Sequence, residues 1–440
     1  MTTMTRRSVL RAGGALAAGT ALAVSDPTGW ARCWAAQQPF VPEKGATLRM
    51  LRWRGFVQTA PEEEAFARMV SAFTAATGVP VAVAIAPLEQ MPLKVLTLAT
   101  IGTGADLAWS LNDDAHLIPD KLVDVSDVAT YLGAKLGGWY PVAKEYGMNG
   151  DRWICLPVAI KGYALNFRIA SVKAAGFSAF PTTLDDFMRL AKQLKRNGHP
   201  MGFALGNAPS DGNNWCYSLL WAFGGGVADA DDHVIINRPE TLAALDYARE
   251  LFPQLIEGTL SWTDKSNNEA FLSGAISCTN NPIVLYAQMR AQNNPLADDI
   301  DHAYFPVGRS GEPREFQVMY PMMLFKHSPY PNAAKALMAF FMEHAQYDPW
   351  LHDSAGYLSH TLKAYNDNPV WTEDPKRTVF RDAAARAKSF GYPGQLNYAA
   401  SSVLSDLVVV RMFADAASGR LTPKQAAEAA ERRIAQYYQG

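Results

Sequence analysis

Short apolar stretches alternate with amphipathic stretches along most of the chain. Apolar residues occupy every second position from Val79 to Ile85, the period of a strand, whereas those between Phe66 and Phe73 recur at helical spacing. The same alternation continues downstream, where we expect strands at 106–109, 154–157, 202–205 and 275–279 and helices at 184–194 and 332–344. Strands that alternate with helices of this length predict an α/β layered fold with largely parallel sheets.

The first 36 residues have the composition of an export signal. The pair Arg6-Arg7 precedes an uncharged stretch rich in Ala and Gly, which is too short and too weakly apolar to span a bilayer. Cleavage could follow the small residues Ala23, Ala31 or Ala35, and we expect it within 31–36. The sequence therefore predicts a twin-arginine signal over residues 1–36 and a soluble protein in the periplasm.

The size and charge of the remaining chain limit its function. Roughly 400 residues are more than one hydrophobic core usually serves, so two lobes are expected. Hydrophobic residues make up 49% and charged residues 19%, which is typical of a globular chain. The signal takes away four arginines and one aspartate, so the formal net charge moves from -2 to -5. Such a chain has no electrostatic attraction to nucleic acid or to an anionic membrane.

Three widely spaced cysteines remain after the signal, at Cys155, Cys216 and Cys278. An odd number at this spacing does not make a disulfide framework, and at most one bridge could form. We expect all three to be small buried apolar residues.

The strong catalytic motifs are missing from the sequence. It has no Gly-rich phosphate loop, no Gly-x-Ser-x-Gly turn and no His-Glu-x-x-His helix, which are the motifs of nucleotide binding, acyl transfer and zinc hydrolysis. The eight histidines are scattered, and His352 and His360 do not have the spacing of two ligands on one helix. We therefore expect a protein that is not an enzyme and that holds no cofactor or metal.

Two adjacent carboxylates are notable for their position. Asp113 and Asp114 directly follow the expected strand at 106–109, and open α/β sheets bind ligands beyond the carboxyl ends of their strands. Glycosidases also use two carboxylates, at a separation that a sequence does not give. The other adjacent pairs, at 231–232 and 298–299, are typical of solvated loops.

Several tryptophans fall at expected strand ends or in loops, namely Trp53, Trp109 and Trp215. Any one of them could be a hydrophobic plug in the core. Together with Asn112 and Asp113 they instead favour a sugar site, because aromatic rings stack on the flat C–H faces of sugars while amides and carboxylates bind the hydroxyls.

The order of motifs from about Leu48 to Ile434 resembles the solute-binding proteins of ATP-driven carbohydrate importers, in the branch of the maltodextrin-binding protein. The similar segments are 73–81 (FTAATGVPV), 104–109 (GADLAW), 150–159 with 164–168, 180–187, 271–276 (FLSGAI) and 416–434. Each motif is weak alone, but together they cover nearly the whole chain. The resemblance implies a two-lobed periplasmic binding protein of type II, with a ligand cleft between the lobes.

This resemblance also implies site residues, one position at a time. Trp109 matches a stacking tryptophan of the family and Asp113 a sugar-binding aspartate, while Trp215 stands where the relative has a stacking tyrosine. The chain departs from the family at Ile283, which replaces another stacking tryptophan, at Asp406, which stands close to a third, and at Lys161, which lies near a position where the relative has Glu. The complete expected ligand-binding set is Trp53, Trp109, Asn112, Asp113, Lys161, Trp215, Asn281, Tyr320 and Asp406.

The expected architecture places residues 41–157 plus 281–320 in one lobe and 158–280 plus 321–440 in the other. We expect a monomer that binds a sugar, short oligosaccharide or polyol and delivers it to the transmembrane subunits of an ABC permease. Two alternatives stay open at this point. One is a periplasmic carbohydrate-active enzyme that uses Asp113 or Asp406, and the other is a metal-binding protein of the same fold. If Lys161 points between the lobes, a ligand with a carboxylate or phosphate would be favoured over a neutral one.

Overall fold

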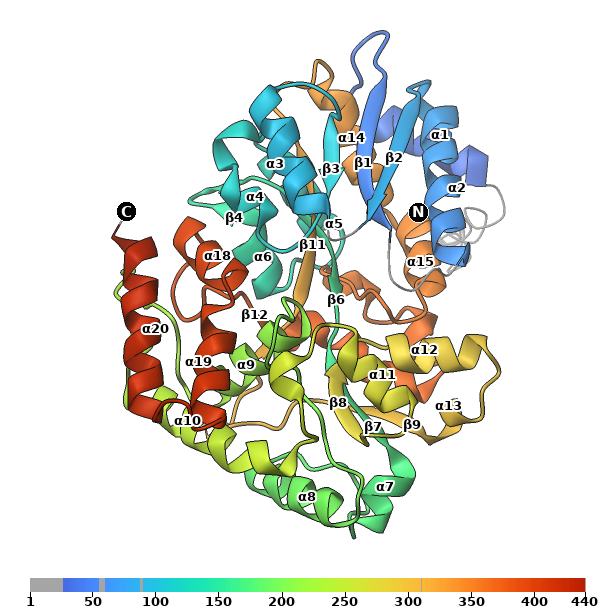
Figure 1. Cartoon of the computed structure of the whole chain (residues 1–440). Coiled ribbons are helices and arrows are strands. Elements are labelled where there is room, and N and C mark those ends of the chain that lie inside the picture. The colour runs from blue at the N-terminus through green and yellow to red at the C-terminus, as the bar shows by residue number, and fades with distance from the viewer. Residues whose placement is uncertain (1–26, 55–59, 88–89, 310, 440) are drawn as a thin grey trace, which may run out of the picture.

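The computed structural model describes residues 27–54, 60–87, 90–309 and 311–439, and it is built around two sheets (Figure 1). The larger sheet has five strands in the order β2 (Val81–Pro87), β1 (Leu48–Arg54), β3 (Leu107–Trp109), β11 (Val318–Leu324) and β6 (Leu156–Lys161). Its first three strands are parallel, whereas β11 runs antiparallel to both β3 and β6. This sheet occupies the upper half of Figure 1.

Helices cover this first sheet and bury its apolar residues. The long helix α2 (Ala60–Thr77) packs against α14 (Pro331–Phe341) and α15 (His344–Asp353), and α14 also contacts β11 and α5 (Ser126–Lys135). The other elements on this side are α3 (Met91–Ile101), α4 (Asp114–Leu117), α6 (Pro141–Gly147), β4 (Met148–Asn149) and β5 (Arg152–Trp153). Every residue of β11 is buried, as expected for a strand covered on both faces.

The smaller sheet forms the centre of the second lobe, in the lower half of Figure 1. Its three strands are antiparallel, with β7 (Ala164–Arg168) between β8 (Cys278–Asn281) and β9 (Ile300–Ala303). The helix and strand elements around it include α7 (Ile169–Ala174), α8 (Leu184–Arg196), α10 (Pro239–Leu251), α11 (Ser266–Leu272), α12 (Val284–Ala291), α13 (Leu296–Asp299), β10 (Glu315–Phe316) and β12 (Ala387–Lys388). The α/β fold class is confirmed, but the sheets are less parallel than expected.

Helix α9 (Asp211–Ala222) is buried along its whole length, because other helices of the second lobe enclose it. It contacts α10, α19 (Val408–Ala417) and the two strands β8 and β10. The C-terminal helix α20 (Pro423–Tyr438) packs on α19 and on α18 (Tyr398–Ser405). The remaining short helices are α16 (Thr378–Arg381) and α17 (Ala383–Arg386).

Three chain segments connect the lobes, and they lie side by side. The strands β6 and β11 pair through Val318 opposite Lys161, and Ser359 pairs with Ile160 on the other edge of β6. The expected lobe boundary at residue 320 does not match this packing. Residues 321–353 were assigned to the second lobe, but β11, α14 and α15 pack with the first sheet, and the chain returns to the second lobe only beyond them.

The first described helix lies almost entirely within the segment expected to be an export signal. Residues 1–26 of the expected signal lie outside the described residues, but α1 (Pro27–Gln37) packs on α2. The Trp34 indole donates a hydrogen bond of 3.0 Å to the buried Glu343 carboxylate, and its ring centroid lies 4.9 Å from that of Phe340. The region where cleavage was expected, 31–36, is therefore part of the packed first lobe.

The cysteine prediction is confirmed: Cys155, Cys216 and Cys278 are buried and unpaired. Within the described residues, no helix combines the length and apolar character needed to cross a membrane.

Candidate functional site

Three of the expected aromatic residues come together at the edge of the first sheet where β1 and β3 end. Trp53 near the end of β1 lies with its ring centroid 4.6 Å from that of Tyr320 in β11 and 5.7 Å from that of Trp109 at the end of β3. The Trp109 indole donates to the Tyr320 carbonyl at 3.3 Å. Parallel strands bring these positions together because their carboxyl ends share one edge of the sheet.

Trp109 is enclosed by the core of the first lobe. Its side chain has no exposed surface, and its ring packs against Phe341 and Trp350, with centroids 5.4 Å away in each case. Arg52 on β1 pairs with Glu62, and its guanidinium lies 5.0 Å from the centroid of the Trp109 ring. The protein itself therefore supplies the ring contacts that the resemblance assigned to a sugar at this position.

The turn after β3 projects polar groups from the edge of the sheet. Asn112 has a φ of 38°, in the left-handed region that Asn tolerates better than most residues, and its backbone N–H donates to the Met319 carbonyl at 2.7 Å. Asp113 follows and precedes α4. The Asn112 Oδ1 and the Asp113 Oδ2 are both buried and accept no hydrogen bond from any described residue.

Asp113 lies where the two lobes meet. Helix α4 contacts α18, and the Ser401 hydroxyl of α18 lies beside the Asp113 carboxylate. Tyr146 from α6 and Tyr217 from α9 lie near the same carboxylate, one from each lobe. Burial is the largest effect on all three groups and raises the pKa of each, and the Asp113 charge raises the pKa of both phenols further.

A layer of aromatic rings extends from these two tyrosines. Tyr146 lies 5.8 Å from Phe390, Tyr217 lies 5.7 Å from Phe316 and 5.4 Å from Trp221, all between ring centroids. The hydroxyls of Tyr146 and Tyr217 and the indole N–H of Trp221 are buried without a hydrogen-bond partner among the described residues. Buried polar groups are normally paired, so these atoms indicate where a ligand or ordered water would bind.

Lys161, at the end of β6, belongs to a second buried polar group. Its Nζ lies 5.1 Å from the centroid of the Tyr163 ring, and the Tyr163 hydroxyl donates to Asp211 at 3.0 Å. The Asp264 carboxylate accepts the backbone N–H groups of Ser210 and Asp211. Burial lowers the pKa of Lys161, and the charges of Asp211 and Asp264 oppose that shift.

Buried amides extend this second group into the smaller sheet. Asn281, at the end of β8, donates to Asn268 and accepts a 2.8 Å hydrogen bond at its carbonyl from Asn166. Asn267 donates to Asp211 at 2.8 Å and Asn280 donates to the backbone carbonyl of Asp211 at 2.8 Å. The group therefore holds the start of α9 against β8, and most of its hydrogen-bonding capacity is used within the protein.

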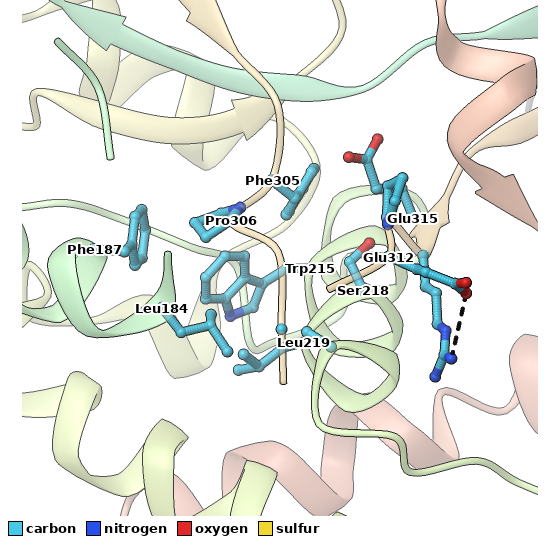
Figure 2. A pocket seen from close by; sticks show the side chains of 13 residues that line it. Leu184, Phe187, Trp215, Ser218, Leu219, Phe305, Pro306, Glu312 and Glu315 are labelled. Carbon is cyan, nitrogen blue, oxygen red and sulfur yellow. Dashed lines mark ion pairs between the residues drawn. The ribbon is translucent and has the colours of Figure 1, made fainter. Parts of the chain in front are cut away.

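Trp215, on α9, lies in a pocket lined by residues of the second lobe (Figure 2). One face of its indole stacks on Phe203, and Figure 2 shows the ring among Leu184, Phe187 and Phe305. The pocket there has about 20 Å³ of free space, room for about one water molecule. A sugar ring does not fit such a pocket.

Asp406 also lies away from the other candidates. Its carboxylate pairs with Arg433 at 2.5 Å and accepts a hydrogen bond from Tyr437, on the outer side of α20. Its side chain is 42% exposed. These two side chains satisfy the charge of Asp406 without any contact to the groups at the sheet edge.

A groove of about 580 Å³ opens between the lobes next to α4 and α18. Its first-lobe wall comes from His116 on α4 and from α6 and the turn after it, and its second-lobe wall comes from 389–398. The Glu145 carboxylate accepts the backbone N–H of Ser389 across it at 3.0 Å. Asp113 itself does not line this groove.

The structure thus brings together Trp53, Trp109, Asn112, Asp113 and Tyr320, with Lys161 and Asn281 in the neighbouring polar group. Sequence reasoning missed Tyr146, Tyr217 and Trp221, which lie on helices with no motif around them. Among the described residues, one exposed group has the spacing of metal ligands, Asp229, Asp231 and His233, and it lies in a surface turn.

Comparison with known proteins places this geometry in a family context. The family model of the bacterial extracellular solute-binding proteins matches residues 68–379. No curated protein sequence matches the chain significantly.

Solved structures with the same fold cover almost the whole chain. The cyclic alpha-maltosyl-1,6-maltose binding protein of Arthrobacter globiformis has a TM-score of 0.74 at 19% identity, over 89% of this chain and 99% of its own. A sugar transporter protein of Arthrobacter chlorophenolicus with bound laminaribiose has a TM-score of 0.73 at 15% identity, over 89% and 99%. An ABC transporter solute-binding protein of Agrobacterium radiobacter in complex with ribitol has a TM-score of 0.70 at 17% identity, over 90% and 99%. These similarities confirm the two-lobed fold.

Proposed function

Because the chain belongs to the family of bacterial extracellular solute-binding proteins, we propose that it binds a sugar, short oligosaccharide or polyol between its lobes and delivers it to the permease of an ABC importer. Proteins of the same fold are described with cyclic maltosyl-maltose, laminaribiose and ribitol. The ligands named for these proteins all carry many hydroxyl groups.

One observation carries the proposal. Buried polar atoms without a partner occur at Asn112 and Asp113, on Tyr146 and Tyr217, whose phenols feel the Asp113 charge, and on Trp221, which packs on Tyr217. Asn112 Oδ1 and Asp113 Oδ2 can accept, the Trp221 indole can donate, and the hydroxyls of Tyr146 and Tyr217 can do either. A polyhydroxylated ligand offers both kinds of group and would satisfy them together.

The same arrangement explains how binding would be signalled. Tyr146 and Asp113 belong to the first lobe, and Tyr217 belongs to the second. A ligand that bridges these groups makes its full set of contacts only when the lobes are closed, so its binding energy shifts the population toward the closed form. The permease would recognise that form.

We propose binding and not catalysis for the carboxylates. Asp406, the second candidate acid of the enzyme alternative, pairs with Arg433 at the surface and does not face Asp113. We also propose export through the twin-arginine route, a location in the periplasm and a monomeric state.

The test is a screen of purified protein against neutral sugars, oligosaccharides and polyols by thermal shift and by calorimetry. A ligand that binds only the folded state raises the melting temperature, and we expect one ligand per chain, unchanged after prolonged incubation. Product formation in proportion to protein would support the enzyme alternative. No response to any polyhydroxylated compound would contradict the proposed ligand class.

A further inference from the structure

Asp113 and its neighbour Asp114 are buried carboxylates of the described chain without a counter-charge. The Asp113 side chain is only 6% exposed, and no lysine or arginine forms an ion pair with it. The Ser401 hydroxyl is the side-chain donor beside it, and this hydroxyl also lies 2.9 Å from the Asn397 carbonyl, so the two oxygens share one proton. Taking a carboxylate out of water without a counter-charge is costly, so this position is unfavourable for the protein alone.

The remaining buried carboxylates show how the protein normally meets this cost. Glu62 pairs with Arg52, Asp106 with Arg49, Glu315 with Arg386 and Glu343 with Lys135, while Asp114 accepts hydrogen bonds from Ser110 and Leu111 and Asp211 accepts them from Tyr163 and Asn267. Asp106 and Asp113 each leave one buried carboxylate oxygen without a hydrogen bond, Oδ1 and Oδ2 respectively, but Asp106 pairs with Arg49 whereas Asp113 has no basic partner.

The surroundings of Asp113 favour a cation further. The Asp113 charge acts on the buried phenols of Tyr146 in the first lobe and Tyr217 in the second, and these rings pack against Phe390, Phe316 and Trp221. The faces of aromatic rings attract cations through their quadrupole, most strongly where water is excluded. A buried carboxylate with aromatic residues of both lobes near it is a combination that recognises ammonium groups.

Basic side chains of the protein do not fill this position. Arg314 and Lys388 lie over the ring of Tyr392, 5.6 Å and 5.4 Å from its centroid, and neither forms an ion pair with Asp113. Lys161 does not favour an acidic ligand either, because the negative charges of Asp211 and Asp264 already attract its ammonium group. If all four groups are ionised, Asp113, Asp211 and Asp264 outweigh Lys161, and the buried charge between the lobes is negative.

We propose that the unpaired Asp113 carboxylate, with Tyr146 and Tyr217 beside it, binds a protonated amine of the ligand, so that the transported solute is an amino sugar or a short oligosaccharide that contains one. This inference rests on the proposed function and makes its ligand class narrower. Alkyl polyamines carry the same ammonium group, and the experiment below distinguishes them from amino sugars by including spermidine.

The experiment compares ligands that differ only in charge. Calorimetry of the purified protein would use the β-1,4-linked disaccharide of glucosamine, its N-acetylated counterpart, maltose and spermidine. The free amine should bind at least about tenfold more tightly than the acetylated disaccharide, because acetylation removes the charge and keeps the sugar skeleton. Equal affinities for the two, or binding of neither amine at millimolar concentration, would overturn the inference.

Comparison of the four ligands also distinguishes a failure of this inference from a failure of the proposed function. Binding of maltose or the acetylated disaccharide with no preference for the amine would leave the proposed function intact and remove the amine. Binding of spermidine with no response to any sugar would uphold the ammonium site and overturn the carbohydrate ligand class.

The substitution Asp113→Asn tests the residue itself. It keeps the shape and removes the charge, so affinity for the glucosamine disaccharide should fall at least about tenfold, while affinity for a neutral ligand changes by less than about threefold. Asp114→Asn is the matched control, since that carboxylate bonds to Ser110 and Leu111 and should not change the amine preference. Melting temperatures show whether each variant folds. An amine preference unchanged in folded Asp113→Asn would overturn the assignment.

Proton release on amine binding provides a second measurement, which would not change if Asp113 had only a structural role. The titratable groups around Asp113 are Asp114 and His116 on α4, Glu145 and Tyr146 on α6 and Tyr217 on α9. Burial raises the pKa of Asp113, and an ammonium beside it would lower that pKa again. Amine binding should therefore release protons, seen as a dependence of the binding heat on the ionisation enthalpy of the buffer, and Asp113→Asn should reduce this dependence.

Discussion

The indole of Trp215 stacks on the ring of Phe203 with centroids 3.8 Å apart and planes inclined by 7°. Phe187 and Phe305 lie near the same indole, at 6.1 Å and 6.2 Å between centroids. The side chain is 4% exposed. These contacts give Trp215 a packing role inside the second lobe, separate from the groups around Asp113.

We expect Trp215→Ala to lower the free energy of unfolding by about 3–5 kcal/mol, the usual cost of removing a buried indole. Chemical unfolding followed by circular dichroism measures this change. Trp215→Phe, which retains a ring against Phe203, is the control and should cost less. A tenfold or larger loss of ligand affinity in Trp215→Phe, with stability retained, would instead support the stacking role suggested by the resemblance.

Tyr217→Phe should weaken ligand binding with little change in stability. Its hydroxyl has no hydrogen-bond partner among the described residues, so its removal breaks no bond within the protein. If the ligand pairs with that hydroxyl, affinity should fall by about 0.5–1.5 kcal/mol, measured by calorimetry with the tightest ligand of the screen. Tyr247→Phe is a control in the same lobe, where the hydroxyl donates to the Leu184 carbonyl, and there stability should fall while affinity stays the same.

Asp114 makes the stability of the free protein depend on pH. Burial, followed by the neighbouring Asp113 charge, raises the pKa of Asp114 from 3.8 to about 7. The folded state therefore holds the Asp114 proton more tightly than the unfolded chain does. The stability that this proton contributes is fully present below about pH 4 and is lost as the pH rises through 7.

Melting temperatures from pH 6.5 to 8.5 test this dependence. The buried His116, whose pKa burial lowers to about 4, has the opposite dependence below pH 6.5 and stays neutral in this range. The wild-type melting temperature should fall across the range, and that of Asp114→Asn should fall less. Parallel curves for the two proteins would contradict the role of Asp114.

The packing of α1 predicts where the mature protein begins. Ala31 is 2% exposed and Trp34 is 6% exposed against α2 and α14, so removal of 27–37 would uncover this part of the first lobe. We expect the exported protein to start before Pro27, consistent with the small residues that end at Ala23. Mass spectrometry of the intact periplasmic protein gives the N-terminus directly.

A variant makes this prediction testable without export. Trp34→Ala should lower the free energy of unfolding by about 3 kcal/mol, because it loses both the indole contacts and the bond to Glu343. Trp30→Ala, at the partly buried start of the helix, should cost less. A mature N-terminus within 32–37 would show that α1 is not part of the working protein.

Local patterns predicted elements well where one face of an element is exposed. The alternation from Val79 to Ile85 matches the edge strand β2, and the expected helix at 184–194 matches α8, whose start is capped by the Thr183 hydroxyl. The expected strand at 202–205 did not form; only the preceding Met201 makes two isolated bridges, to Leu255 and to Cys278. A Cβ on Gly202 would lie 2.5 Å from Trp262, so tertiary packing and not an apolar run determines the backbone there.

The site was predictable only in part, for similar reasons. Asp113 could be found because it follows a strand that ends at the ligand-binding edge of an α/β sheet. Tyr146 and Tyr217 could not, because they stand 71 residues apart on different helices, and only the fold brings both phenols within reach of the Asp113 charge. Trp109 ends a strand that is buried on both faces, so no periodicity shows which side its ring takes.

The pairing of β6 with β11 and with Ser359 has a consequence for motion. Because backbone hydrogen bonds join all three connecting segments, including both between Ile160 and Ser359 at 3.0 Å and 2.7 Å, the lobes cannot slide past one another without breaking them. The hinge must bend as one ribbon, and the irregular pairing at Tyr320 and Pro321 is where its ladder is already interrupted. Solutes of different size would then set different closing angles about one axis, and that angle is the quantity a permease could read.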